Sequence, residues 1–123
     1  MVMYDIYKSI IISFYDAMSN RDFEKLASFL QEDAVFEFPG AKICIGEKRV
    51  LLLLTMLTRK YTILNFSVSE CIVENESACA IWTNSGISTA GEDYSNSGVT
   101  VFRFRDDKII FLSDYFKDTS FVK

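Results

Sequence analysis

One acidic residue, Asp114, lies inside a stretch that is otherwise rich in apolar side chains. A carboxyl group taken out of water has a raised pKa, because burial disfavours its charged form. Such a group can remove a proton from a carbon flanked by two carbonyls and return a proton to the alkoxide that forms later. We expect Leu112, Phe116 and Trp82 to exclude water from it. The sequence therefore identifies Asp114 as a candidate general acid/base, with no histidine or second acid beside it.

A predicted β-hairpin over residues 99–116 positions this carboxylate. Two runs rich in β-branched and aromatic residues are separated only by an Asp-Asp pair, which is the pattern of antiparallel strands joined by a two-residue turn. Counting outward from the turn predicts that Asp114 faces Val99 and that Leu112 faces Val101. All four side chains then share one surface of the sheet.

The opposing hypothesis leaves Asp114 without a chemical role. In that case it lies at an open rim, either solvated or paired with Arg103 or Lys117, since a perturbed carboxylate marks a functional site in only some proteins. The protein would then bind a small hydrophobic ligand without catalysis, or only dimerise. Whether Asp114 is buried with polar partners distinguishes the two hypotheses.

Further residues could line a binding site around Asp114. Trp82 and Asn84 fall on the Asp114 face of the sheet, although an indole there is more often part of the core, and its N–H needs a partner. Apolar stripes at helical spacing usually indicate plain packing, yet the same side chains can line a cavity. The candidate substrate-binding residues are Phe14, Met18, Phe38, Leu54, Trp82, Asn84, Val101, Leu112 and Phe116.

Hydrophobic periodicity predicts the elements that hold these residues. Apolar residues recur at three- and four-residue spacing near the N-terminus, which indicates an amphipathic helix. The segment 47–60 is apolar nearly all round its centre and poor in β-branched residues, so we expect a buried helix there. The predicted helices are 4–18, 22–31 and 47–60, and the predicted strands are 34–38, 62–74, 77–89, 96–105 and 108–116.

Composition limits the class of protein. With half of its residues hydrophobic and a single proline, the chain 1–123 fits one domain. Thirteen basic and seventeen acidic residues give a net charge of −4 without a long basic run, so no nucleic-acid partner is expected. The longest apolar run, residues 50–54, is far shorter than the roughly 20 residues that span a bilayer. No export signal is recognisable, and we expect a soluble, cytoplasmic protein without membrane contact.

The three cysteines do not form a disulfide framework. If residues 75–76 form the turn between two strands, Cys71 pairs with Ala80 and Cys79 with Ile72. The two thiols then lie on opposite faces of the sheet and stay reduced. Because the chain has no histidine and no Cys-x-x-Cys pair, the sequence predicts neither a metal site nor a cofactor.

The order of these elements, helices first and strands afterwards, predicts an α+β layer with helices on one face of a curved sheet. Together with the motifs at 20–22, 32–39, 102–109 and 114–116, and with Trp82 in a strand, the chain resembles the SnoaL-like members of the nuclear transport factor 2-like superfamily. The resemblance implies a cone: a bent antiparallel sheet wrapped around about three N-terminal helices and enclosing an apolar pocket. The resemblance covers nearly the whole chain. Members of the family include polyketide cyclases, epoxide hydrolases and steroid isomerases, so the fold alone does not choose a reaction.

The positions that carry activity in these relatives narrow the choice. Where steroid isomerases have a tyrosine and two acids, this chain has Phe14, Phe38 and Thr100, and the Arg-x-Asp pair of the epoxide hydrolases is missing from residues 80–85. Only the acid at Asp114 remains, which is the pattern of the polyketide cyclases. The resemblance therefore implies a cofactor-independent cyclase or isomerase-type enzyme that acts on an apolar, oxygenated, polyketide-like substrate. The alternative remains a non-catalytic binding or dimerisation module.

The last strand also predicts an assembly. One-sided sheets alternate apolar and polar residues, but Ile109 and Phe111 alternate with Ile110 and Leu112. An apolar outer face of this size needs to be covered. We therefore expect a homodimer that forms through the outer face of the sheet, which is also the assembly that the resemblance implies.

Overall fold

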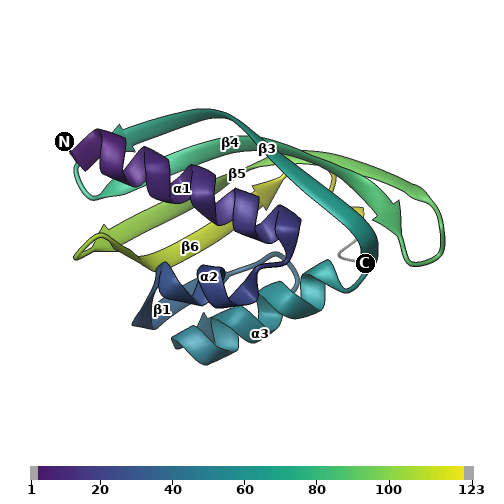
Figure 1. Cartoon of the computed structure of the whole chain (residues 1–123), viewed down its shortest axis with the longest axis horizontal. Coiled ribbons are helices and arrows are strands. Elements are labelled where there is room, and N and C mark those ends of the chain that lie inside the picture. Colours follow the sequence, from purple (N-terminus) through teal and green to yellow (C-terminus); the bar gives the residue numbers. More distant parts are fainter. Residues whose placement is uncertain (1–2, 121–123) are drawn as a thin grey trace.

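The computed structural model describes residues 3–120 as three helices and one six-stranded sheet, an α+β arrangement (Figure 1). The elements follow the order expected from the sequence, with one further short strand, β2. Their bounds are α1 Met3–Asn20, α2 Phe23–Ser28, β1 Leu30–Glu37, β2 Cys44–Ile45, α3 Glu47–Thr58, β3 Tyr61–Glu74, β4 Ser77–Ser88, β5 Asp93–Arg105 and β6 Lys108–Phe116.

The sheet is mixed rather than wholly antiparallel, which corrects the prediction. Its strand order is β2-β1-β6-β5-β4-β3, and β1 pairs in parallel with β6 while every other pair is antiparallel. The strands β3 to β6 form the expected meander. The last strand then returns beside the first one in the same direction, a long-range pairing that sequence periodicity does not reveal.

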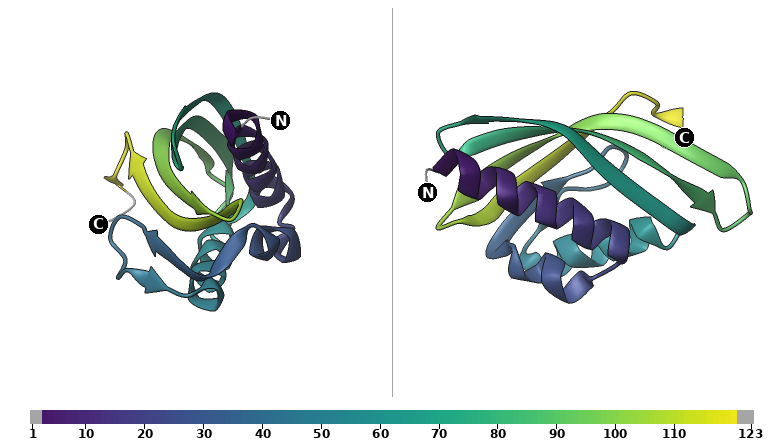
Figure 2. Two further views of the ribbon diagram at one scale, coloured as in Figure 1. Left: turned by 90° about the vertical axis from the view of Figure 1, so that its left-hand side faces the viewer. Right: turned by 45° about the horizontal axis from the view of Figure 1, so that its top comes forward.

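All three helices lie on the same side of the sheet, as predicted. Figure 2 shows the sheet curling around α1, with α2 and α3 below it. The sheet does not close, since β2 and β3 form its two edges. This arrangement gives the molecule a concave inner face that the helices cover and a convex outer face.

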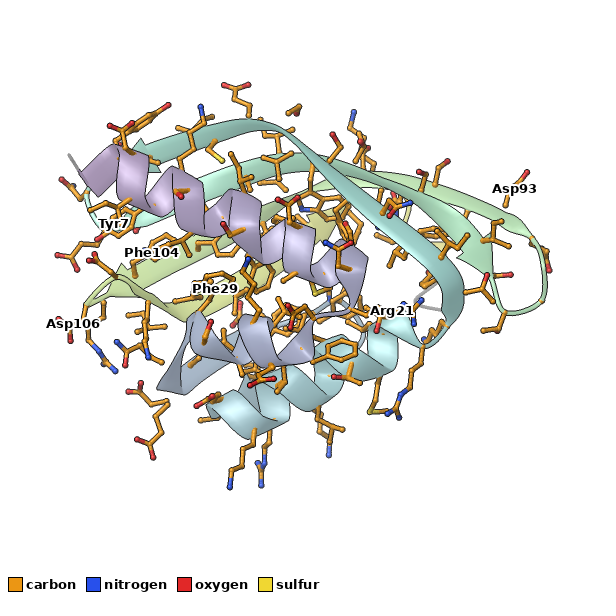
Figure 3. All side chains as sticks on the ribbon, in the orientation of Figure 1. Tyr7, Arg21, Phe29, Asp93, Phe104 and Asp106 are labelled. Atoms are coloured by element: carbon orange, nitrogen blue, oxygen red, sulfur yellow. The ribbon has the colours of Figure 1, made fainter. Side chains whose placement is uncertain are left out.

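The narrow end of the molecule, where the turn at Asp106 between β5 and β6 lies (Figure 3), is filled by aromatic rings. Tyr7 of α1 stacks on Phe104 of β5 with 4.1 Å between ring centroids, and Figure 3 shows the two side by side, far from Asp93 at the other end of the sheet. Phe14 packs edge-on against Phe102 at 5.7 Å. Because these rings occupy the narrow end, any open interior space lies toward the other end of the cone.

Helix α3 differs from the buried helix that was predicted. Val50, Leu54 and Thr58 are buried, but Leu52 is 58% exposed and Met56 is 52% exposed. The leucine-rich run is apolar on all sides, whereas the helix presents only one stripe to β1 and the interior, so its remaining apolar residues face outward. Within the described part of the chain, no helix combines the length and apolar character required to cross a membrane.

The second predicted helix, 22–31, ends earlier than expected. Asp22 caps α2, and its carboxylate accepts a hydrogen bond from the backbone N–H of Lys25. The helix ends at Ser28, because Leu30 already pairs with Ile109 of β6. Residues from Leu30 onward therefore pair as a strand, although the spacing of their apolar residues also fitted a helix.

The hairpin between β5 and β6 has the predicted turn but not the predicted register. Asp106 and Asp107 both have positive φ, 53° and 58°, as a two-residue hairpin turn requires. A β-bulge follows, because Phe104 pairs with Ile109 whereas Arg103 pairs with Phe111. Ile110 is therefore the extra residue on β6.

The bulge shifts every pair beyond it by one residue. Asp114 pairs with Thr100 and Leu112 with Phe102, so the predicted partners Val99 and Val101 are wrong. Because side chains alternate between the two faces of a strand, Val99 and Val101 belong to the outer face.

The cysteine pairing is confirmed. Cys71 pairs with Ala80 and Cys79 with Ile72. All three cysteines are free thiols; Cys71 is buried, while Cys44 and Cys79 are partly exposed.

Candidate functional site

A cavity lies between the concave face of the sheet and the helices α1 and α3. Its volume is about 90 Å³, whereas one water takes up about 30 Å³ in the liquid. The space therefore suits a few waters or one small organic molecule. Its lining includes Phe14, Met18, Phe38, Leu54, Trp82, Asn84, Leu112, Asp114 and Phe116.

Nine of the ten predicted site residues therefore line the cavity, and the exception is Val101. Val101 does not line the cavity, because its neighbours Thr100 and Phe102 on β5 are buried on the inner face and side chains alternate along a strand. Thr100 occupies the inner position next to it and is buried. Asp114 therefore has the hydroxyl group of Thr100 beside it, where an apolar valine was predicted.

Asp114 has a polar partner inside this apolar surrounding. Thr100 donates a hydrogen bond from Oγ1 to Asp114 Oδ1 at 2.7 Å. Burial raises the pKa of the Asp114 carboxyl from 3.8 to about 7, although the Thr100 hydrogen bond alone favours the charged form and opposes that rise. Among residues 3–120, Asp114 forms no ion pair with Arg103 or Lys117. A pairing of Asp114 with Arg103 or Lys117 is therefore wrong for this structure; the residue is partly buried, with the Thr100 hydroxyl as its partner.

This pKa predicts how the stability of the protein depends on pH. The folded chain holds the Asp114 proton more tightly than the unfolded chain, so the contribution of this group is complete below pH 3.8 and is lost as the pH rises through about 7. We expect the free energy of unfolding to fall by about 2–3 kcal/mol between about pH 5 and about pH 8 on account of this group. Urea unfolding of the wild type and of Asp114→Asn at the two pH values measures it. An equal pH dependence in both proteins would contradict the assignment.

Thr100 is the centre of a hydrogen-bond network. Its Oγ1 accepts a hydrogen bond from the Tyr15 hydroxyl at 2.6 Å and another from Trp82 Nε1 at 2.9 Å. A hydroxyl group has two acceptor positions and one proton. Since both acceptor positions are filled and an indole N–H can only donate, the Thr100 proton is directed to Asp114. The network fixes Oδ1 of the Asp114 carboxyl group.

Tyr15 places a phenol in the cavity, which the sequence analysis missed. The position expected to carry it holds Phe14, and both residues line the cavity. Burial, and secondarily the nearby Asp114 carboxylate, raise the pKa of Tyr15 well above its ordinary value of 10.0. The phenol therefore stays protonated and donates to Thr100. The spacing of Tyr7, Ile11 and Tyr15, all buried, is the i, i+4 signal that could have found it.

Strand register sets the depth of each group. Gly98 of β5 lies between Phe116 and Trp82 in the ladder, and a Cβ at Gly98 would meet the Tyr115 carbonyl oxygen at 2.4 Å and the Trp82 ring at 2.9 Å. The missing side chain is what allows the indole to lie there. Asp114 lies opposite Thr100, nearer the narrow end than Gly98 and Trp82 do.

Asn84 lies two residues beyond Trp82 on β4 and farther from the narrow end. Its side chain is 6% exposed and lines the cavity. Its Oδ1 atom is buried and has no hydrogen-bond partner among the described residues. Leaving a buried acceptor unpaired costs about 1–3 kcal/mol, so this position is polar at the expense of stability.

Two tyrosines and a lysine form the lining farthest from the narrow end. Tyr61 and Tyr94 lie with 4.7 Å between ring centroids, and both line the cavity with Lys60. Burial and a hydrogen bond with Tyr94 raise the pKa of Tyr61. Tyr94, which falls in a predicted loop, is part of β5.

The described residues contain no group of three or more His, Cys, Asp or Glu side chains placed to hold a metal ion. Among the described residues that line the cavity, Asp114 is the only acidic one. Any acid/base chemistry in this space depends on that one carboxyl group, with Tyr15 as the neighbouring phenol.

Comparison with known families now bears on this site. A family profile described as the SnoaL-like domain matches residues 11–112. The chain belongs to the SnoaL-like family. The match ends before Asp114, so membership in the SnoaL-like family does not by itself identify the acid. A comparison with curated protein sequences finds no match.

Solved structures share the SnoaL-like fold at low identity. A nuclear transport factor 2-like protein from Burkholderia pseudomallei is 18% identical, with 91% of each chain covered and a TM-score of 0.83. A proposed SnoaL-like polyketide cyclase from Jannaschia sp. is 12% identical, with 92% of this chain and 86% of that chain covered and a TM-score of 0.82. A protein from Catenulispora acidiphila with a ketosteroid isomerase-like fold, in complex with trimethylamine, is 11% identical, with 86% and 83% covered and a TM-score of 0.79. These likenesses establish the fold alone.

Proposed function

We propose that this SnoaL-like protein is a cofactor-independent enzyme of the cyclase or isomerase type, in which Asp114 acts as the general acid/base on a small apolar, oxygenated substrate. One observation carries the proposal: an acid whose pKa is about 7 lies in an apolar cavity with one oxygen held by a buried threonine. A catalytic acid/base is most effective when its pKa lies near the working pH.

The proposed reaction moves one proton through the carboxyl group. Asp114 Oδ2 takes a proton from a carbon next to a carbonyl, and the electron pair of the C–H bond moves to the carbonyl oxygen to give an enolate. In a cyclisation the enolate carbon attacks a second carbonyl and forms a C–C bond. The protonated Asp114 then returns the proton to the new alkoxide, which regenerates the carboxylate.

The cavity and the named neighbours support this class of substrate. The lining is mostly aromatic and aliphatic, which favours an uncharged apolar molecule. Structural neighbours include a protein proposed to be a polyketide cyclase and one with a ketosteroid isomerase-like fold. The cavity volume of about 90 Å³ favours a small substrate. One observation supports the alternative, a non-catalytic ligand-binding module: the described lining contains no second acid beside Asp114.

Proton exchange at the central carbon of acetylacetone tests the proposal without knowledge of the natural substrate. Exchange in deuterated water is followed by proton NMR with increasing amounts of protein. We expect a rate above the buffer background that is proportional to protein concentration and rises with pH through one titration at about 7, since the ionised form is the base. No acceleration at any pH would favour the binding-module alternative.

We further propose that the outer face of the sheet forms a homodimer. Val99, Val101 and Phe111 are only partly buried in one chain, and Ile72 and Tyr115 are 54% and 59% exposed. Apolar residues gathered on one face indicate an interaction surface. We expect a dimer in sedimentation velocity at micromolar concentration, and a monomer for Val101→Glu, because a buried unpaired charge opposes association. A monomeric wild type would contradict this proposal.

A further inference from the structure

Asn84 is the exception among the buried polar side chains of the described residues. The other three, Thr58, Thr100 and Ser113, each have a hydrogen-bond partner. Asn84 Oδ1 is buried and has none. Buried polar atoms in native proteins are almost always paired, so an unpaired one calls for a reason.

The surroundings of Asn84 point to a ligand as that reason. The residue lines the cavity, together with the rings of Phe66 and Trp82, whose centroids are 5.4 Å apart. Asn84 pairs in register with Phe66 of β3 and Asn96 of β5. The side chain that carries the unpaired oxygen therefore lies at an aromatic stretch of the cavity, and Asp114 lines the same cavity at a different depth.

The chemistry of the atom defines what it can bind. An amide oxygen accepts hydrogen bonds and cannot donate them. A hydrocarbon, an ether or a ketone offers it no proton, whereas a hydroxyl or an N–H group does. A site with a buried acceptor also discriminates strongly against an analogue that lacks the matching donor, because the acceptor is then left unpaired.

We infer that the ligand of this cavity carries a hydroxyl or N–H group that donates to Asn84 Oδ1 while its apolar body lies against Phe66 and Trp82. This inference rests on the proposed function to the extent that the cavity is the substrate site. It narrows the substrate to a small apolar alcohol, phenol, enol or amine-bearing molecule. The hydrogen bond at Asn84 also orients the molecule, so that the rest of it extends toward Asp114.

Phenol, anisole and toluene test the inference, because they share an aromatic body and only phenol carries a donor. Dissociation constants are measured by NMR titration for the wild type, Asn84→Leu and Asp114→Asn. We expect phenol to bind the wild type and Asp114→Asn at least about tenfold more tightly than anisole. In Asn84→Leu that ratio should fall to about one while toluene binding is retained.

The variants also separate this inference from the proposed function. Equal binding of phenol and anisole to the wild type, or a phenol preference that survives in Asn84→Leu, would overturn the inference. A preference lost in Asp114→Asn alone would place the donor at the carboxylate and overturn it as well. Loss of acetylacetone exchange in Asp114→Asn, with the phenol preference intact, supports both proposals; unchanged exchange in that variant removes the proposed function and leaves the Asn84 site.

Folding of the test variant has its own control. Leucine has nearly the shape of asparagine and removes the unpaired oxygen, so the midpoint of thermal unfolding of Asn84→Leu should lie at or above that of the wild type. A lower midpoint would show that Asn84 stabilises the unliganded protein through its side chain, and would contradict the inference that its oxygen is kept for a ligand.

Discussion

Asp114→Asn is expected to abolish proton exchange while the fold and the affinity for apolar ligands are retained. An amide cannot take a proton from carbon near neutral pH, and a positioned general base contributes about a hundredfold to ten-thousandfold to a rate. Asparagine keeps an oxygen that can accept the hydrogen bond that Thr100 donates to Asp114. The rate of acetylacetone exchange, measured with the affinity for toluene, separates catalysis from binding.

Two comparisons make this result decisive. Near neutral pH the variant should be at least as stable as the wild type, because the raised pKa of Asp114 means that its ionised form is disfavoured in the fold. Asp33 offers a matched control, since it is an exposed carboxylate paired with Arg105, and Asp33→Asn should leave exchange unchanged. If Asp114→Asn unfolds, or exchanges protons as fast as the wild type, the catalytic role is wrong.

Thr100→Val is expected to be the most destabilising of the conservative changes near the site. Valine has the shape of threonine but no hydroxyl, so the Tyr15 hydroxyl and the Trp82 indole N–H both lose their acceptor inside the core. Each unpaired buried group costs about 1–3 kcal/mol, so the two together give a loss of roughly 2–6 kcal/mol in the free energy of unfolding. Urea unfolding followed by fluorescence measures it, and Trp82 is the only tryptophan in the chain.

Thr100→Val should also change the pKa of the Asp114 carboxyl group. Without the donor at Thr100, the ionised form of Asp114 loses its one hydrogen bond to a described side chain, and the pKa should move above about 7. Thr100→Ser keeps the hydroxyl and should restore both stability and pKa. A valine variant that is as stable as the wild type, or a serine variant as damaged as the valine one, would show that the network contributes nothing.

Local sequence patterns predicted most of the fold. The turn at residues 106–107, the strand that carries Asp114 and the pairing of Cys71 with Ala80 could all be predicted, because turn chemistry and alternation are local. The parallel pairing of β1 with β6 could not, since it joins segments far apart in the sequence. The bulge at Ile110 left no signal either, because the adjacent residues Ile109, Phe111 and Leu112 are equally apolar.

The site was predictable only in outline. Asp114, Trp82 and Asn84 share the cavity as expected, since two-residue periodicity along a strand gives the face directly. The hydrogen bonds of Thr100 were not predictable, because a threonine in a strand is ordinary and its partners come from α1, β4 and β6. Tyr15 was missed because the resemblance directed attention to the residue before it.

The titration of the Asp114 carboxyl group tests the account most directly. Carbon-13 NMR of aspartate-labelled protein, with Asp114→Asn used to assign the resonance, follows the side-chain carboxyl carbon as a function of pH. The account predicts a pKa of about 7, set by burial in the apolar cavity against the hydrogen bond from Thr100. A pKa at or below the ordinary value of 3.8 would contradict it, because an acid that stays ionised across the neutral range is not held in an apolar site.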